Sequence, residues 1–140
     1  MNIKQLETSY GVLGQIELTD LPEIAEKGFA TLICNRPDSE IEAGLHSGVI
    51  EAEANRLGIT FVYNPISPSG LTPENLEIQA SAKAESNGPV LAYCRSGMRS
   101  TMVWSLLKSG RLSVDEIVTV AASAGYNIDG LRPKIEALAA

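Results

Sequence analysis

The sequence predicts an α/β fold in which a mainly parallel central sheet is flanked by helices. This prediction rests on three short apolar runs, residues 30–34, 59–63 and 89–93. Segments of helical character separate them. Strands that alternate with helices form βαβ units, whose helices cover both faces of a parallel sheet. The 140 residues, of which 44% are hydrophobic, suit one packed domain, which we expect to span residues 1–140.

Two helices and two strands are expected in the first half of the chain. A proline in the first turn and a glycine at the end delimit a helix over residues 20–28. The apolar run 30–34 follows as a buried strand. Apolar residues spaced for one helical face predict a second helix over residues 47–57, and the run 59–63 is the next strand.

The second half is expected to contain one strand among four helices. A helix over residues 72–86 begins with a threonine cap, a proline and a glutamate near its positive end. The strand 89–93 follows, and the next helix starts after Cys94. A capping box begins another helix at Ser113, and apolar residues at helical spacing place a last helix over residues 128–138.

The charge balance excludes several classes of partner. There are 17 acidic and 11 basic residues, a formal net charge of −6. Binding to nucleic acid through bulk charge needs many neutralised phosphates, so we expect no nucleic-acid partner. We also expect no membrane association, because there is neither a basic amphipathic helix nor an apolar stretch of about 20 residues. Without an N-terminal apolar run or a disulfide framework, a cytoplasmic location is expected.

We expect neither a metal site nor a cofactor. The only histidine is His46, which excludes a His-dependent triad and a three-histidine metal site. The two cysteines, Cys34 and Cys94, form no Cys-x-x-Cys motif or Cys/His cluster. Cys34 lies inside an apolar strand without basic neighbours and is therefore expected to be a core residue.

The segment from Tyr93 to Ser100, Tyr-Cys-Arg-Ser-Gly-Met-Arg-Ser, indicates chemistry. Backbone N–H groups of a turn between a strand and a helix can join the positive end of the helix in an anion cradle. Cys94 at its rim is the expected nucleophile, because a positive setting favours the thiolate. Arg99 can donate two hydrogen bonds to a bound oxyanion. The expected anion-binding residues are Arg95, Ser96, Gly97, Met98 and Ser100.

Charge placement supports this interpretation. Four basic residues and no acidic ones lie between Ser86 and Val114. These basic residues are Arg95, Arg99, Lys108 and Arg111. The rest of the chain has a balance of −10, from 7 basic and 17 acidic residues. The expected substrate is therefore a small anionic group. Arg36 and Asp38, which follow the strand 30–34, are candidate supporting residues that could orient Arg99.

Cys94 to Arg99 match the rhodanese-type pattern Cys-Arg-x-Gly-x-Arg/Thr. The segment also resembles the Cys-x5-Arg-Ser/Thr phosphate loop of the protein tyrosine phosphatases, but it is one residue shorter. Ser100 stands where such a phosphatase carries arginine. The helices expected from Ser113 and Asn127 onward resemble those of the dual-specificity phosphatases, whereas a rhodanese domain would close with a strand.

Nearly the whole chain is similar to a bacterial family, the phosphatase-like domain of beta-lactamase hydrolase-like proteins, sometimes labelled a sulfurtransferase family. The matching segments are residues 9–15, 35–38, 70–74, 89–100, 124–126 and 130–133. This resemblance implies a protein-tyrosine-phosphatase-like fold of the dual-specificity type. It leaves the reaction open, because a fold does not fix a function.

The first hypothesis is a cysteine-dependent sulfurtransferase. Cys94 would take a sulfane sulfur from a donor and become a persulfide, which the loop N–H groups and Arg99 would stabilise. This reaction needs no strong general acid, because the donor's leaving group is already a stable anion. The short loop also suits a single sulfur atom. Both features favour sulfur transfer over the alternatives.

The alternative is a phosphatase, in which Cys94 attacks phosphorus and a carboxylic acid protonates the leaving oxygen. Phosphatases of this kind place that acid in a loop roughly 30 residues before the cysteine, but residues 64–69 contain neither Asp nor Glu. Asp38 or Glu74 could substitute if either lay over the cradle. A third hypothesis is a non-catalytic module that binds an anion or senses oxidants through Cys94.

Overall fold

The computed structural model describes residues 1–140 and contains a central five-stranded sheet with the order β1-β2-β5-β3-β4. Only β1 runs antiparallel to its neighbour, β2, and all other pairs are parallel. The strands are β1 (Lys4–Glu7), β2 (Tyr10–Leu13), β3 (Thr31–Cys34), β4 (Thr60–Tyr63) and β5 (Val90–Tyr93). The prediction of a mainly parallel sheet is therefore confirmed, and the hairpin of β1 and β2 is an addition to it.

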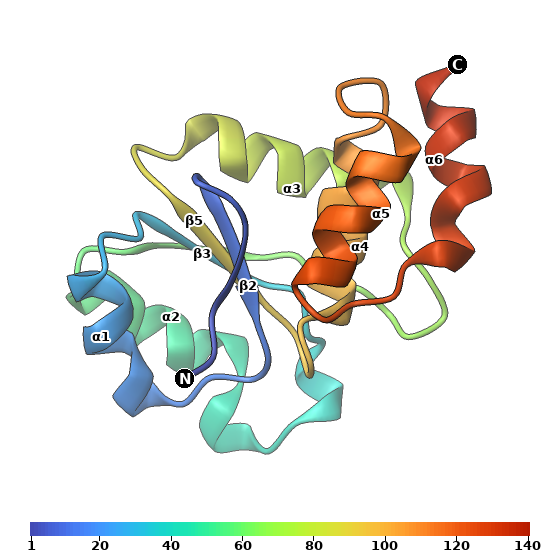
Figure 1. The fold of residues 1–140 in the computed structure, drawn as a ribbon. Coiled ribbons are helices and arrows are strands. Elements are labelled where there is room, and N and C mark those ends of the chain that lie inside the picture. The colour runs from blue at the N-terminus through green and yellow to red at the C-terminus, as the bar shows by residue number, and fades with distance from the viewer.

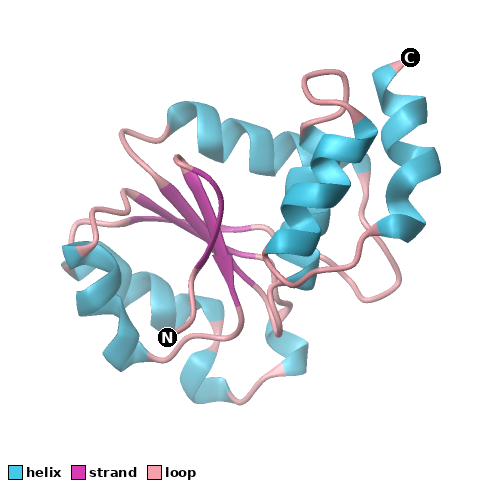
Figure 2. Ribbon diagram, in the orientation of Figure 1, coloured by secondary structure: helices cyan, strands magenta, loops and turns pink.

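Helices cover both faces of this sheet, as Figures 1 and 2 show. The helices on one face are α1 (Leu21–Glu26) and α2 (Ser47–Arg56). Those on the other face are α3 (Pro73–Glu85), α4 (Met98–Leu107), α5 (Val114–Ser123) and α6 (Arg132–Ala139). Each layer encloses its own apolar cluster, so the sheet separates two cores.

The alternation of side chains along β5 divides it between the two cores. Val90 and Ala92 belong to the cluster under α4, α5 and α6, whereas Leu91 and Tyr93 belong to the cluster under α1 and α2. Such alternation is the period of two that a strand imposes. Trp104 of α4, only 2% exposed, fills the first of these cores.

The predicted helix starts are confirmed by their capping groups. Thr72 Oγ1 accepts from the N–H of Asn75 (3.1 Å) at the start of α3, and Ser113 Oγ accepts from the N–H of Glu116 (3.1 Å) at the start of α5. The segment expected as one last helix instead begins with the 3₁₀ turn Asp129–Leu131, and α6 follows with a proline in its first turn. No helix has the length and apolar character needed to cross a membrane.

The carboxyl ends of β2, β3 and β5 lie at one edge of the sheet. Leu13 and Cys34 are both in register with Tyr93, so the segments after all three strands emerge side by side. In open α/β sheets, this edge is where ligands bind. The topology therefore places the loop that begins at Cys94 against residues 14–15 and residues 35–40.

Candidate active site

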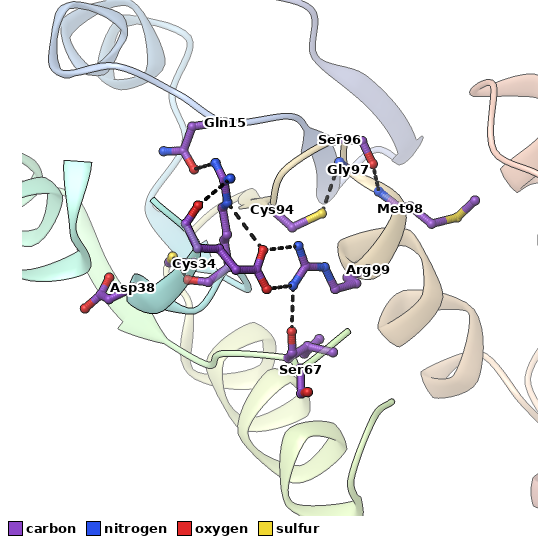
Figure 3. Close-up of polar contacts among 12 residues, drawn as sticks. Gln15, Cys34, Asp38, Ser67, Cys94, Ser96, Gly97, Met98 and Arg99 are labelled. Atoms are coloured by element: carbon purple, nitrogen blue, oxygen red, sulfur yellow. Dashed lines mark hydrogen bonds and ion pairs between the residues drawn. The ribbon is translucent and has the colours of Figure 1, made fainter. Parts of the chain in front are cut away.

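Cys94 lies at the bottom of a loop that joins β5 to α4, and its side chain is 1% exposed. The N–H of Gly97 donates a hydrogen bond to Cys94 Sγ over 3.1 Å (Figure 3). Gly97 has φ 96°, a left-handed conformation that glycine adopts without strain. This conformation turns the loop back over the sulfur, so that the N–H of Gly97 points at it.

The start of α4 supplies the N–H groups of an anion site. The first helical hydrogen bond joins the N–H of Thr101 to the carbonyl of Gly97 (3.0 Å), so the N–H groups before it have no helical acceptor. One of them, that of Met98, donates to Ser96 Oγ over 3.3 Å. Free N–H groups and the positive helix end together make this position suitable for a phosphate or another small anion.

Contacts from distant segments brace the loop. The carbonyl of Arg95 accepts from the N–H of Gln15 (3.2 Å), and the carbonyl of Ser96 accepts from the Tyr126 hydroxyl (2.9 Å). Gly14 allows this close approach, because a Cβ there would lie 2.9 Å from the Arg95 carbonyl oxygen. Burial, with a smaller contribution from Cys94, raises the pKa of Tyr126. The loop is thus held in one shape by the segment after β2 and by the segment after α5.

Arg99 extends from the first turn of α4 toward a carboxylate (Figure 3). Its Nη1 donates to Glu40 Oε2 and to the carbonyl of Ile66, both at 2.8 Å, and its Nη2 donates to Glu40 Oε1 at 2.7 Å. The hydrogen bond with Glu40 raises the pKa of the guanidinium, and Cys94 adds to this shift. Arg99 therefore lies beside Cys94, but two of its nitrogens already form a bidentate ion pair with Glu40.

Glu40 is the site residue that the sequence did not reveal. Its carboxylate also lies 3.5 Å from Arg36 Nε, and its carbonyl accepts from Arg36 Nη2 at 2.9 Å. The hydrogen bond from Arg99 holds the pKa of Glu40 below its ordinary value of 4.5. The spacing of Arg36 and Glu40, four residues apart, was the only sequence signal of this cluster. Arg36 is thus linked to Arg99 through Glu40.

The proposed role of Asp38 needs correction, because Asp38 does not orient Arg99. Its two carboxylate oxygens accept from the N–H of Ser47 (2.7 Å) and from Ser47 Oγ (2.8 Å). Asp38 therefore satisfies the free donors at the start of α2, which is a structural role. The carboxylate that pairs with Arg99 is that of Glu40, two positions further along the chain.

Ser100 also differs from its expected place, because its hydroxyl is buried beneath the loop. It donates to Asn35 Oδ1 over 2.9 Å rather than into the cradle. Asn35 in turn bonds to Gln79, whose amide donates to the Tyr10 hydroxyl at 2.8 Å. The side chain of Ser100 thus anchors α4 to a buried polar network. Among the expected anion-binding residues, Arg95 and Ser96 are exposed and Gly97 is buried.

The positive segment found in the sequence is divided in space. Arg95 and Arg99 lie near Cys94, but Lys108 and Arg111 follow the opposite end of α4 and line a separate cavity of about 240 Å³. Lys108 pairs there with Glu7 at 2.9 Å. The cations near Cys94 are therefore Arg95, Arg99 and Arg36, and Glu40 offsets part of their charge.

A pocket of about 530 Å³ opens beside Arg99. Its apolar lining comes from Ile66, Leu71, Met98 and Met102, and its charged lining comes from Arg36, Glu40, Arg95 and Arg99. Cys94 is not among the residues that line it. The pocket has room for the remainder of a substrate whose anionic group lies at the loop of Cys94. No group of three or more His, Cys, Asp or Glu side chains is placed to hold a metal ion.

Replacing Glu40 with glutamine should make the fold less sensitive to acid. The lowered pKa of Glu40 means that its ionised form stabilises the folded chain above the unfolded value near 4.5, and that this stabilisation is lost as the pH falls through the lower folded value. Over this pH range we expect the free energy of unfolding of the unmodified protein to fall by about 1 kcal/mol. Urea unfolding at neutral pH and at about pH 3 measures it.

The matched control for this prediction is Glu26→Gln, because Glu26 is exposed and forms no ion pair. The control should lose as much stability on acidification as the unmodified protein. An equal loss in Glu40→Gln would contradict the stabilising role of the ion pair.

The sheet order, the cysteine loop and the helix that follows it define a protein of the protein-tyrosine-phosphatase-like class. The structure of Tk-PTP in its active form superimposes with a TM-score of 0.74 at 18% identity, over 99% of this chain and 96% of that one. PTPMT1 also shares the fold. The predicted fold class is thereby confirmed.

Residues 2–111 match the family model described as "Beta-lactamase hydrolase-like protein, phosphatase-like domain". The chain belongs to this family, as its resemblance indicated. A beta-lactamase hydrolase-like protein of Xylella fastidiosa is 25% identical over 130 residues, which are 91% of this chain but 30% of that protein. A crystal structure of a candidate phosphatase from Neisseria meningitidis is 30% identical, with a TM-score of 0.86 over 99% of both chains.

Proposed function

We propose that this chain is a cysteine-dependent phosphatase that acts on a small anionic phosphate compound. The observation that carries the proposal is the position of Cys94 Sγ, which accepts from the N–H of Gly97 below the free N–H groups of α4 and beside Arg99. This arrangement would bring a nucleophile and an oxyanion site together at one point. Membership of a phosphatase-like family supports the same activity.

The reaction would proceed in two displacements. In the first, the Cys94 thiolate forms an S–P bond while the bond from phosphorus to the leaving oxygen breaks and its electron pair stays on that oxygen. The loop N–H groups bind the other phosphoryl oxygens throughout. In the second, water attacks phosphorus, the S–P bond breaks with its electrons on sulfur, and inorganic phosphate and a proton are released.

Two proteins of the same fold bind polyanions in their solved structures. The SIW14 phosphatase of S. cerevisiae holds citrate, and PTPMT1 holds PI(5)P. At 15% and 12% identity, these proteins share only the fold with this chain. They support the proposal that the cradle after β5 takes an anionic ligand here too.

Sulfur transfer remains the second candidate, and the four-residue spacing between Cys94 and Arg99 favours it. The Cys94 thiolate would attack the outer sulfur of a donor such as thiosulfate. The S–S bond would break with its electrons on the departing sulfite, which leaves a persulfide on Cys94. This step requires no protonated carboxyl group in the site.

A mass measurement of the acid-quenched protein distinguishes the two reactions. After mixing with p-nitrophenyl phosphate, we expect the peptide containing Cys94 to gain the mass of one phosphoryl group while phosphate is released. Cys94→Ser should lose both the adduct and the turnover, and Cys34→Ala, which changes the buried thiol, should keep them. Gain of one sulfur atom from thiosulfate, with no phosphate release from the phosphate ester, would overturn the phosphatase proposal in favour of sulfur transfer.

A further inference from the structure

Glu40, the carboxylate that pairs with Arg99, is not able to act as a general acid. A general acid must carry a proton at the working pH and reach the leaving oxygen. Both oxygens of Glu40 accept from Arg99 at 2.7 and 2.8 Å, and the pKa of Glu40 is lowered by this contact. Glu40 is therefore ionised at neutral pH, with no proton to donate.

The other acids in the surroundings are also committed to structural contacts. Asp38 lies away from Cys94 (Figure 3), and both of its oxygens accept from Ser47. Asp129 accepts from Arg132 at 3.3 Å. The Tyr126 hydroxyl donates to the Ser96 carbonyl, and burial raises its pKa, which makes it a poorer proton donor. Each of these groups is therefore a poor source of a proton for a leaving group.

The segment that borders the pocket contributes an acceptor to the site and no acid. Residues 64–70 contain no Asp or Glu. The carbonyl of Ile66 accepts from Arg99 at 2.8 Å, which ties this segment to the arginine. The exposed Glu74 lies beyond it, in the first turn of α3.

Three arginines line the space where a leaving group would lie, and the one acid that lines it with them, Glu40, is paired with Arg99. The pocket of about 530 Å³ is lined by Arg36, Arg95 and Arg99, with Ile66, Met98 and Met102 on its apolar side. Arg95 is exposed and takes part in no ion pair. A fixed positive charge stabilises a departing anion but cannot protonate it.

We infer that the substrate is an activated phosphate, whose leaving group departs as a stable anion without protonation. Acyl phosphates, phosphoanhydrides and phosphate esters of acidic phenols have this chemistry, whereas esters of alkyl alcohols do not. This inference rests on the proposed phosphatase function. The S–P bond forms, the bond to the leaving oxygen breaks, and the leaving group takes the electron pair and no proton.

A series of aryl phosphates with graded leaving groups tests the inference. We expect kcat/KM to fall about tenfold for each unit by which the pKa of the leaving phenol rises, because a full negative charge develops on its oxygen. Acetyl phosphate should be hydrolysed readily and phosphoserine not measurably. The phenol of tyrosine, with a pKa of about 10, should make phosphotyrosine a poor substrate. A nearly constant kcat/KM across the series would overturn the inference.

Failure of the proposed function would look different from failure of this inference. If no phosphate is released even from dinitrophenyl phosphate and Cys94 gains no phosphoryl group, then the phosphatase proposal itself is wrong. If the adduct forms and the leaving group has little influence, the phosphatase proposal stands and a general acid is present.

An acid added to the segment beside the pocket should change the dependence on the leaving group. Ser67 is exposed and lines the pocket, so Ser67→Asp would place a carboxyl group near the leaving oxygen. We expect this variant to hydrolyse esters of weakly acidic phenols at least about tenfold faster and to show a new decline in rate at high pH. Ser67→Asn, with a side chain of the same size but no acid, should keep the steep dependence. If kcat/KM depended only weakly on the pKa of the leaving phenol in both the unmodified protein and Ser67→Asp, the inference would also be overturned.

Discussion

Replacement of Gly97 by alanine is expected to abolish turnover and to lower the free energy of unfolding by about 2 to 4 kcal/mol. A Cβ at this position would overlap the Tyr126 hydroxyl oxygen and lie 2.9 Å from its Cζ, on a residue with φ +96°. Either the Tyr126 side chain, which braces the loop, or the loop itself must therefore move, and the strain at φ +96° disturbs the N–H of Gly97 that donates to Cys94 Sγ. Hydrolysis of an activated aryl phosphate and urea unfolding measure the two effects.

Two further variants separate the loop geometry from a general effect of alanine. Gly130→Ala is the matched control, because nothing lies within 4 Å of a Cβ there, and it should keep both activity and stability. Tyr126→Phe in the Gly97→Ala background removes the hydroxyl overlap but leaves the Cζ contact and the backbone strain, so it should restore stability only in part. Normal turnover by Gly97→Ala would show that the loop of Gly97 is not the anion site.

The loop that carries Cys94 was predictable as a candidate site because its signal is local. Cys94, Gly97 and Arg99 lie within six consecutive residues after an apolar run, and a strand, a turn and a helix bring such residues together without long-range information. The same holds for the capped helices α3 and α5, whose starts depend on residues three positions apart.

The carboxylate partner of Arg99 was not predictable in this way. Glu40 is 59 positions away in the sequence, and only the parallel register of β3 with β5 brings the two residues together. Asp38 was an equally reasonable candidate, because its distance from the strand end is similar. Asp38 pairs with Ser47 rather than with Arg99 because α2 begins at Ser47. The sequence gives little information about the exact path of the loop between β3 and α2.

The edge strand β1 was missed for a different reason. Among its four residues only Leu6 is buried, so it shows no alternation of apolar and polar side chains. It is held by backbone pairing with β2, whose register includes Lys4 with Val12. The side-chain pattern of β1 therefore gives little indication of the backbone pairing with β2 that makes it a strand.

A third group of residues has polar side chains in the interior, where the sequence pattern favours apolar ones. Asn35, Asn64 and Gln79 are each 0% exposed. They are tolerated because their amides satisfy one another. Gln79 Oε1 accepts from Asn35 Nδ2 (2.9 Å) and from Asn64 Nδ2 (2.8 Å). A buried network of this kind fixes one geometry only if every member is satisfied.

Replacement of Gln79 by leucine is expected to lower the free energy of unfolding by about 2 to 3 kcal/mol. The substitution leaves buried amides of Asn35 and Asn64 with fewer partners. Asn35 holds both sides of the site: its Oδ1 accepts from Ser100 Oγ, and its carbonyl accepts from the N–H of Ile66 at 2.9 Å. A looser Asn35 would misplace Arg99, so kcat/KM should also fall about tenfold or more.

Activity measured well below the unfolding transition separates this positioning role from a purely structural one. Glu77→Leu, on the exposed side of the same helix, is the matched control and should change stability by less than about 0.5 kcal/mol. If the network positions the loop, Gln79→Leu and Ser100→Ala should each lower kcat. Their losses should be less than additive in the double variant, because each substitution removes a hydrogen bond to the same residue, Asn35. A Gln79→Leu protein that is destabilised yet turns over at the normal rate while folded would show that the network supports the fold alone.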